Sequence, residues 1–315
     1  MRAVCLNKNG LEVDCNYPQP KPNESESLIR VLLAGICSTD LELVKGYYEY
    51  QGVLGHEFVG IVEQSSEPGW IGKRVVSSIN FADANSPEFA EFGLEHHPRR
   101  TVLGIVARDG AMADYVVVPT QNLFEIPPTV SDREAVFVEP LAAAIRIAEQ
   151  IQLRPTHRVA VLGPGRLGLL VAQVLMLRGA EVTVFGRSQS SLELPQQLGL
   201  STALTEDAED SSFHLVAECT GSPQGLVEAI RMARPCGTLV LKSTYAGQAS
   251  INFTKVVVDE IKIVGSRCGP FAPAIRLLER RQVEVNSLID GIYGIEQARQ
   301  AFDRAAQSGA SERFC

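Results

Sequence analysis

Hydrophobic residues are spaced differently in two parts of the chain. Up to about residue 126, short β-branched runs are bounded by Gly, Pro and Ser, a pattern typical of strands in a small barrel or sandwich. We expect such strands at residues 28–33, 58–62, 74–76 and 114–118. From residue 158 to about residue 278, strand-like and helical segments alternate, which predicts an α/β fold with a doubly wound parallel sheet.

The transition between the two parts falls in a helical segment. Ser131 and Glu134 have the spacing of a capping box, and a helical pattern continues to about residue 151. Pro155 marks the boundary with the alternating part. After residue 285, a strand-like pair at 288–289 precedes a helical pattern at 295–307, a tail that could return to the first part.

A glycine-rich turn lies at the start of the alternating part. The apolar run 159–162 indicates a buried strand, and it leads through a G-x-G-x-x-G turn into a helical segment and a second strand at 182–185. This context favours dinucleotide binding. Gly163 permits the tight turn, Gly165 lets a pyrophosphate approach the backbone, and Gly168 lets helix and strand pack closely. Together with Arg166 and Leu167, these residues open a helix whose free N–H groups favour phosphate.

The end of the second strand indicates which dinucleotide binds. An NAD-specific site usually has Asp or Glu there, about 20 residues after the glycine turn, to bind the ribose 2′-hydroxyl. This chain has Gly186, which we expect to leave room for a phosphate and to remove a repelling charge. Arg187 can pair with that phosphate, and Ser188 can donate another hydrogen bond. The sequence therefore predicts a preference for NADP(H) over NAD(H).

Composition excludes several classes of protein. The chain has 315 residues, a length that suggests about two domains, and its net charge of −8 argues against a nucleic-acid partner. It shows no signal-peptide pattern and no uninterrupted apolar run that could span a membrane. Seven scattered cysteines without a C-x-x-C pair fit reduced thiols, so we expect a cytoplasmic protein.

The β-rich part contains residues that could bind a metal. Cys37 stands in a G-I-C-S-T-D segment, His56 and Glu57 stand in G-H-E, and Glu139 stands in E-P-L. A thiolate, an imidazole and a carboxylate can together hold zinc with one position left open for a substrate. Each residue alone is more often a core or surface residue, so the argument depends on their combination.

These segments, in this order and followed by the glycine turn, resemble the zinc-dependent medium-chain dehydrogenase/reductase superfamily, and its polyol, threonine and sugar dehydrogenases in particular. The resemblance covers nearly the whole chain, including Thr220 and Gly221, which follow a strand and are expected to contact the cofactor. It implies a GroES-like β-rich catalytic domain of residues 1–130 and 285–315 and a Rossmann domain of residues 131–284. It also implies catalysis in the cleft between the domains.

The resemblance assigns roles to individual residues. Cys37 and His56 match two catalytic zinc ligands, and either Glu57 or Glu139 could be the third. Glu57 matches a carboxylate that binds the metal in some members and supports a ligand in others, and Glu139 matches either a ligand or a catalytic residue that holds the zinc-bound water. Thr39 matches the hydroxyl that accepts the substrate's proton, and Asp40 matches a residue that orients a ligand. In the implied reaction, zinc acts as a Lewis acid on an alcohol or polyol, and hydride passes to C4 of the nicotinamide. The reverse reaction reduces an aldehyde or ketone.

Two departures from the family pattern are visible. The segment 80–100, where relatives carry four cysteines for a structural zinc, contains none, so we expect one zinc per chain. We interpret His96 and His97 in this segment as exposed loop residues rather than a remnant metal site. Glu42 stands where many relatives have a proton-relaying His, and either this carboxylate or solvent could carry the proton.

Two other functions remain open from the sequence. A zinc-free quinone or enone reductase generally lacks the Cys and G-H-E segments. A non-catalytic NADPH-binding redox sensor would fit the unusual tail from Ser311 to Cys315. Tyr47, Tyr48 and Phe81 are candidates to line the substrate site, but they do not identify the substrate. Relatives form homodimers or homotetramers through the edge of the Rossmann sheet, and residues 260–264 are a candidate for that edge.

Overall fold

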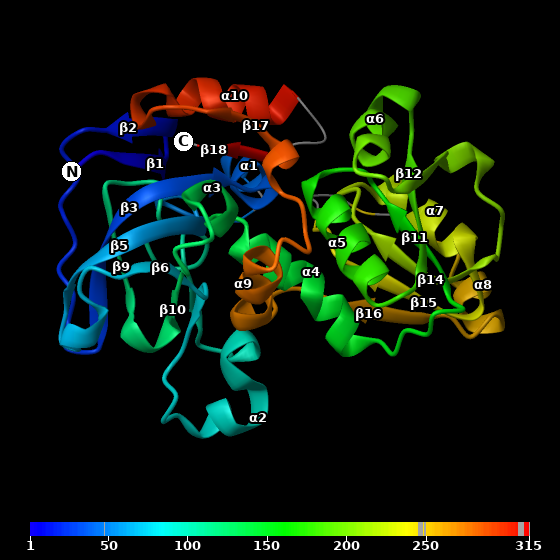
Figure 1. Ribbon diagram of the computed structural model, residues 1–315, viewed down its shortest axis with the longest axis horizontal. Helices are drawn as coiled ribbons and strands as arrows, with labels where there is room; N and C mark the ends of the chain where they lie inside the picture. The colour runs from blue at the N-terminus through cyan, green and yellow to red at the C-terminus, as the bar shows by residue number, and fades with distance from the viewer. Residues whose placement is uncertain (47, 245–247, 249, 308–311, 315) are drawn as a thin grey trace. The chain divides into compact units, whose positions relative to one another are not determined.

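The computed structural model divides the chain into two compact units, which are described separately (Figure 1). It describes residues 1–46, 48–244, 248, 250–307 and 312–314, the last three in backbone only. Unit 1 comprises Met1–Glu139, Ala274–Gln282 and Ile289–Cys315, and unit 2 comprises Pro140–Pro273 and Val283–Leu288. The domain boundaries given above stay a prediction.

Unit 1 is built mainly on antiparallel strand pairs, with one parallel pair at the edge of its largest sheet. Its largest sheet has the strand order β10-β6-β5-β3-β18-β17, with β9 also paired to β3. These strands are β3 (Glu26–Ile36), β5 (Glu57–Ser65), β6 (Arg74–Ser77), β9 (Tyr115–Pro119), β10 (Leu123–Glu125), β17 (Ile289–Ile292) and β18 (Glu312–Phe314). Two smaller sheets are formed by β1 (Ala3–Asn7), β2 (Gly10–Asp14) and β4 (Gly52–Val53), and by β7 (Asn80–Phe81) and β8 (Thr101–Val102). The four strands predicted in this part are therefore present: β3, β5 and β6 are longer than predicted, and β9 is shifted by one residue from the predicted 114–118.

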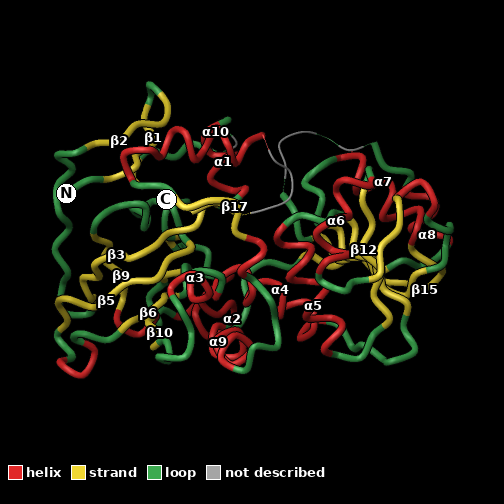
Figure 2. The backbone as a smooth tube through the Cα atoms, turned by 45° about the horizontal axis from the view of Figure 1, so that its top comes forward, coloured by secondary structure: helices red, strands yellow, loops and turns green. Residues whose placement is uncertain are grey.

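Segments from the two ends of the chain lie side by side in unit 1. Helix α10 (Ala298–Gln307) contacts β2, and Arg299 donates a hydrogen bond to the carbonyl oxygen of Leu11 at 2.6 Å (Figures 1 and 2). Three further helices belong wholly to this unit, namely α1 (Ser38–Val44), α2 (Pro87–His96) and α3 (Asp132–Ala135). The predicted return of the tail to the first part is observed.

Unit 2 contains a parallel sheet of the order β13-β12-β11-β14-β15-β16. The strands are β11 (Arg158–Leu162), β12 (Glu181–Gly186), β13 (Ser201–Leu204), β14 (Phe213–Glu218), β15 (Ala233–Leu241) and β16 (Lys262–Gly265). The order reverses between β11 and β14, and ligands of such sheets bind outside the carboxyl ends of the strands at this point. Strand β16, which overlaps the segment proposed above for the edge, ends the order on one side.

Helices connect the parallel strands of unit 2. They are α5 (Arg166–Leu177), α6 (Gln189–Gln197), α7 (Pro223–Met232) and α8 (Phe253–Val258). Figures 1 and 2 show α5 and α7 on opposite sides of the strands. Between α7 and the sheet, buried apolar residues form a core in which the rings of Phe185 and Phe213 meet edge to face at 5.3 Å. This core fixes the strand ends on which the glycine turn depends.

The helix predicted from Ser131 to residue 151 is interrupted. Helix α3 ends at Ala135, and α4 (Val138–Gln150) begins after a short break. Pro140 explains the break, because proline is tolerated in the first turn of a helix but costs about 3 kcal/mol in its interior. Helix α9 (Phe271–Glu279) follows β16 later in the chain. None of the described helices combines the length and apolar composition needed to cross a bilayer.

Candidate active site

Strand pairing brings Cys37 and His56 together. In the antiparallel pair of β3 and β5, Gly35 lies opposite Glu57. Cys37 follows the last residue of β3, and His56 precedes the first residue of β5. Two segments that are about 20 residues apart in the sequence therefore meet at one end of the sheet.

The side chains of Cys37, His56 and Glu57 form the site. The thiol sulfur, one ring nitrogen and one carboxylate oxygen all lie within 4.8 Å of one another. Among the described residues, no other group of three His, Cys, Asp or Glu side chains meets this criterion. His56 is 3% exposed and Glu57 is 1% exposed. The donor set matches zinc, which binds sulfur at about 2.3 Å and nitrogen or oxygen at about 2.0–2.2 Å.

Asp40 lies behind this group and is fully buried. One of its carboxylate oxygens accepts a hydrogen bond from the backbone N–H of Cys37 at 2.8 Å, and the other lies 3.5 Å from Nδ1 of His56. A carboxylate in this position orients the imidazole and fixes which ring nitrogen faces a metal.

The electrostatics of the group favour a cation. Burial lowers the pKa of His56, but the nearby Asp40 and Cys37 raise it, and the pKa lies well above its ordinary value. The site therefore stabilises positive charge in a buried position, as a metal-binding site must.

A loop of unit 1 holds the backbone before His56 in place. A Cβ on Gly104 or on Gly110 would lie 2.4 Å from the carbonyl oxygen of Gly55, so only glycine allows this approach. Ala111 also donates a backbone hydrogen bond to that oxygen at 2.9 Å. Sequence reasoning missed Gly104 and Gly110, because a glycine in a loop does not reveal which backbone it packs against.

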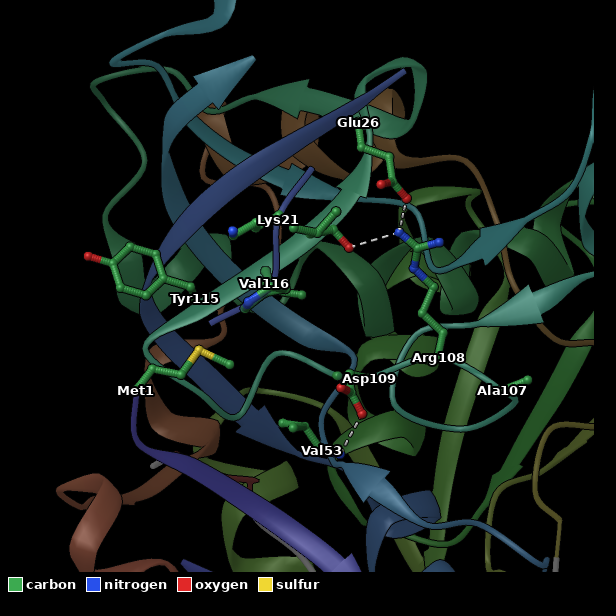
Figure 3. A pocket seen from close by; sticks show the side chains of 12 residues that line it. Met1, Lys21, Glu26, Val53, Ala107, Arg108, Asp109, Tyr115 and Val116 are labelled. Atoms are coloured by element: carbon green, nitrogen blue, oxygen red, sulfur yellow. Dashed lines mark hydrogen bonds and ion pairs between the residues drawn. The ribbon is translucent and has the colours of Figure 1, made fainter. Parts of the chain in front are cut away.

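Charged residues secure the same loop from its other side, where they line a hollow of about 270 Å³ (Figure 3). Arg108 pairs with Glu26, and Asp109 accepts the backbone N–H of Val53 at 3.0 Å. Asp109 also accepts the hydroxyl of Tyr17 at 2.8 Å. These interactions give Arg108 and Asp109 a structural role beside the candidate site.

The remaining predicted residues of unit 1 lie as follows. Thr39 is in the first turn of α1, with its hydroxyl 3.7 Å from the sulfur of Cys37. Glu42 forms an ion pair with Lys45 at 2.8 Å. Glu139 is half-buried in the first turn of α4 and is outside the group of Cys37, His56 and Glu57.

The two described aromatic candidates for the substrate site differ in burial. Tyr48 is exposed, whereas Phe81 is buried beneath the guanidinium of Arg108 at 4.9 Å from its ring centre. Tyr47 lies outside the described residues, as do Ser311 and Cys315 of the tail.

The expectation that His97 is exposed is wrong. His96 is exposed, but His97 is only 1% exposed and lies in the cysteine-free segment. Its Nδ1 accepts the backbone N–H of Arg99 at 3.1 Å, and its Nε2 lies 2.7 Å from the hydroxyl of Ser86. Because Nδ1 accepts, the ring proton resides on Nε2 and is donated to Ser86. This bonded histidine ties both ends of the segment together.

The glycine turn of unit 2 has the expected conformation. Gly163 has a φ of +104°, and a Cβ there would lie 2.8 Å from the carbonyl oxygen of Cys219. A Cβ on Gly168 would lie 2.0 Å from the carbonyl oxygen of Gly163. Gly165 is the N-cap of α5, and Arg166 and Leu167 form its first turn. The turn therefore presents the start of a 12-residue helix at the carboxyl end of β11.

Gly186, at the end of β12, is required for a different reason than the room for a phosphate that we expected. A Cβ on Gly186 would lie 2.5 Å from Oγ of Ser191 and 2.8 Å from Cδ2 of Leu192, so that side is filled by α6. The expected room for a phosphate is not on the Cβ side. Arg187 is exposed, and Ser188 is the N-cap of α6, its hydroxyl accepting the backbone N–H of Ser191 at 3.4 Å.

Thr220 and Gly221 follow β14 at the carboxyl edge of the same sheet and are exposed. Two residues beneath them, Glu218 and Ser243, were not among the predicted site residues. A carboxylate at the end of the otherwise largely apolar strand β14 was the available signal for Glu218.

Comparisons with known proteins agree with this geometry. The family "Alcohol dehydrogenase GroES-like domain" matches residues 23–128, and the family "Zinc-binding dehydrogenase" matches residues 167–280. The chain is 28% identical to a sorbitol dehydrogenase of Halalkalibacterium halodurans, over 93% of this chain and 91% of that protein. It is 32% identical to glucose 1-dehydrogenase 1 of Caldivirga maquilingensis, over 79% of this chain and 77% of that protein.

A solved structure is similar over nearly the full length. A Sinorhizobium meliloti 1021 protein, assigned to the zinc-binding dehydrogenases and bound to NADP, matches with a TM-score of 0.90 and 26% identity. The match covers 99% of this chain and 98% of that one.

Proposed function

The chain belongs to the medium-chain dehydrogenase/reductase superfamily, and from this we propose that it is a zinc-dependent oxidoreductase that prefers NADP(H). It is an alcohol dehydrogenase-like enzyme with a GroES-like domain and a Rossmann-like parallel sheet. The proposed reaction transfers a hydride between the nicotinamide and an alcohol or polyol, or the matching aldehyde or ketone. The sorbitol dehydrogenase among the relatives supports a polyol.

The buried group of Cys37, His56 and Glu57 carries the proposal. When bound, zinc would polarise the oxygen of the substrate as a Lewis acid. The protein's own part is to supply a thiolate, an imidazole and a carboxylate, and to orient the imidazole through Asp40. The pyrophosphate would be bound by the glycine turn and the first turn of α5, namely Gly163, Gly165, Arg166, Leu167 and Gly168. Thr220 and Gly221 would contact the nicotinamide half, and Arg187 and Ser188, which follow Gly186 at the end of β12, would contact the 2′-phosphate.

Thr39 would move the proton of the substrate hydroxyl. Its own hydroxyl lies next to the sulfur of Cys37 and can both accept and donate a hydrogen bond. Glu42 is one helical turn further along α1, but its carboxylate is paired with Lys45. Either Glu42 or solvent would take the proton onward from Thr39.

A substrate screen tests the activity directly. Purified protein is supplied with NADP and a set of polyols, sugars and simple alcohols, and with NADPH and the matching carbonyl compounds. NADPH absorbance then reports turnover. Turnover of a polyol supports the proposal, whereas reduction of quinones or enones by zinc-free protein would contradict it.

Metal analysis of purified protein is expected to give close to one zinc per chain. Cys37, His56 and a carboxylate provide one site, and residues 80–100 lack the cysteines of a second. A value near two would contradict the single site. A value near zero after expression with ample zinc would reject the zinc mechanism itself.

The same measurement on Glu57→Gln and Glu139→Gln identifies the third ligand. A carboxylate oxygen of Glu57 lies within 4.8 Å of the donor atoms of both Cys37 and His56, whereas Glu139 is outside this group. We therefore propose that Glu57 ligates zinc and that Glu139 is a catalytic residue that does not bind the metal. Loss of zinc from Glu139→Gln alone would reverse this assignment.

The protein is expected to form a homodimer, or a homotetramer of two such dimers, through the edge of the unit 2 sheet. Four exposed apolar side chains lie on α8 and the edge strand β16, namely Phe253, Val257, Val258 and Ile263, with exposed fractions of 59%, 73%, 72% and 40%. An exposed sheet edge is a natural template for a second chain.

Light scattering should show a dimer or larger for the wild type and a monomer for Ile263→Glu combined with Val257→Glu. Ile71→Glu, which changes an exposed isoleucine of unit 1, is the control, and a monomeric wild type would reject this interface.

A cytoplasmic location and the absence of a nucleic-acid partner are part of the proposal. The six described cysteines form no disulfide with one another, and the net charge is −8.

A further inference from the structure

Glu218 is a buried carboxylate at the carboxyl edge of the unit 2 sheet. It is the last residue of β14 and is 1% exposed. In the sheet register it lies beside Leu162 of β11, the residue before the glycine turn, and beside Leu241 of β15. It therefore lies next to the point where the strand order reverses.

Both oxygens of Glu218 accept hydrogen bonds from loops after two different strands. Oε1 accepts the backbone N–H of Thr220 at 2.7 Å and the hydroxyl of Thr220 at 2.5 Å. Oε2 accepts the hydroxyl of Ser243, which follows β15. The oxygen of Ser243 in turn accepts the backbone N–H of Gly221 at 3.0 Å. Together with the peptide bond between Thr220 and Gly221, these hydrogen bonds join the four residues in a ring, and the charge-assisted bonds to Glu218 compensate its burial.

This ring is in contact with the glycine turn and the start of α7. The carbonyl oxygen of Cys219 lies where a Cβ on Gly163 would approach to 2.8 Å, so the two loops touch through backbone atoms. A Cβ on Gly225 in α7 would lie 2.9 Å from Oε1 of Glu218. Thr220 and Gly221 are exposed above the ring, whereas Glu218 is enclosed beneath them.

We propose that Glu218 is a positioning residue for the nicotinamide cofactor. It holds the Thr220–Gly221 turn and Ser243 in one arrangement beside the glycine turn, without touching the cofactor itself. A carboxylate suits this role because each of its oxygens accepts from a different loop, whereas an amide has one oxygen and its NH₂ group cannot accept the proton of the Ser243 hydroxyl. The inference rests on the proposed function, in which Thr220 and Gly221 contact the cofactor.

The test is a fluorescence titration with NADPH in the absence of substrate. Glu218→Gln is expected to raise the Kd about tenfold, the equivalent of about 1.4 kcal/mol. Ser243→Ala should raise the Kd by a similar factor, and the double variant by little more than either, because both changes break the same bond. The KM for NADPH should rise in parallel, while kcat at saturating NADPH stays within about twofold.

Asn252→Ala is the control for a purely structural effect. Asn252 caps α8 of the same unit by accepting the backbone N–H of Thr254 at 3.0 Å, so its loss lowers Tm without changing the ring. An equal rise of Kd in Asn252→Ala would overturn the role of Glu218. So would wild-type affinity in Ser243→Ala, which carries the test if Glu218→Gln does not fold. A wild-type protein that binds neither NADPH nor NADH would overturn the proposed function and this role together, whereas normal wild-type binding with unchanged variants would overturn this role alone.

Discussion

Alanine in place of Cys37 or His56 is expected to lower kcat/KM by at least about 10³-fold and to release the zinc. Each side chain supplies one of the three donors that lie within 4.8 Å of one another, and two donors alone hold zinc weakly. Lewis-acid stabilisation by a metal contributes several kcal/mol, and about 4 kcal/mol corresponds to about 10³ in rate. Steady-state kinetics and metal analysis on the same preparations measure both effects.

Measuring the Kd for NADPH distinguishes loss of zinc in these variants from loss of folding. The metal donors belong to unit 1 and the glycine turn belongs to unit 2, so the Kd for NADPH should stay within about twofold. Cys15→Ala and His96→Ala remove an exposed cysteine and an exposed histidine of unit 1 and should leave turnover and zinc content unchanged. Wild-type turnover by a metal-free Cys37→Ala protein would refute the zinc mechanism.

Replacing Arg187 with alanine is expected to lower the preference for NADP over NAD by about ten- to a hundredfold. A hydrogen bond to a charged group contributes about 1.5–3 kcal/mol, and each 1.4 kcal/mol is about tenfold in affinity. Arg187 is exposed directly before the N-terminus of α6, where a guanidinium and free N–H groups could share one phosphate. The ratio of kcat/KM values for the two cofactors measures the preference.

The structure determines which variants suit this measurement. Gly186→Asp would restore the acidic residue of NAD-specific proteins, but its Cβ would collide with Ser191 and Leu192, so its effect would mix specificity with misfolding. Arg178→Ala is a matched control. It removes an exposed arginine of the same unit that lies at the C-terminal end of α5, whereas the glycine turn lies at the N-terminal end of that helix. A wild-type kcat/KM that is higher with NAD than with NADP would show that the assignment of Arg187 is wrong, while leaving the dehydrogenase function intact.

Local sequence patterns predicted the fold well wherever the structure of a segment depends on its own residues. The apolar runs that became β3, β5 and β11 are short and rich in Val, Ile and Leu, so their composition indicates strands directly. The sequence was misleading between residues 131 and 151, because a helical pattern does not show where a proline forces a new start. It was also misleading at His97, whose burial depends on Ser86 and Arg99 folding around it.

The candidate site was predictable to the extent that its residues adjoin recognisable strands. Cys37 and His56 flank two paired strands, so their meeting follows from the sheet register once the strands are known. The role of Glu218 was not predictable, because its partner Ser243 is 25 residues away and they meet only through the pairing of β14 with β15. The same holds for Gly104 and Gly110, whose importance lies in the backbone of Gly55.

The position of β18 between β3 and β17 sets an order of assembly. During synthesis, residues 140–273 of unit 2 are complete while unit 1 still lacks residues 289–314. The end of β3, which leads into Cys37, gains its partner β18 only when residues 313 and 314 have left the ribosome. Contacts of such long sequence separation form late, and domains fold in the order in which they emerge. The nucleotide-binding half of the enzyme is therefore ready to fold before the strand that precedes Cys37 has its last neighbour.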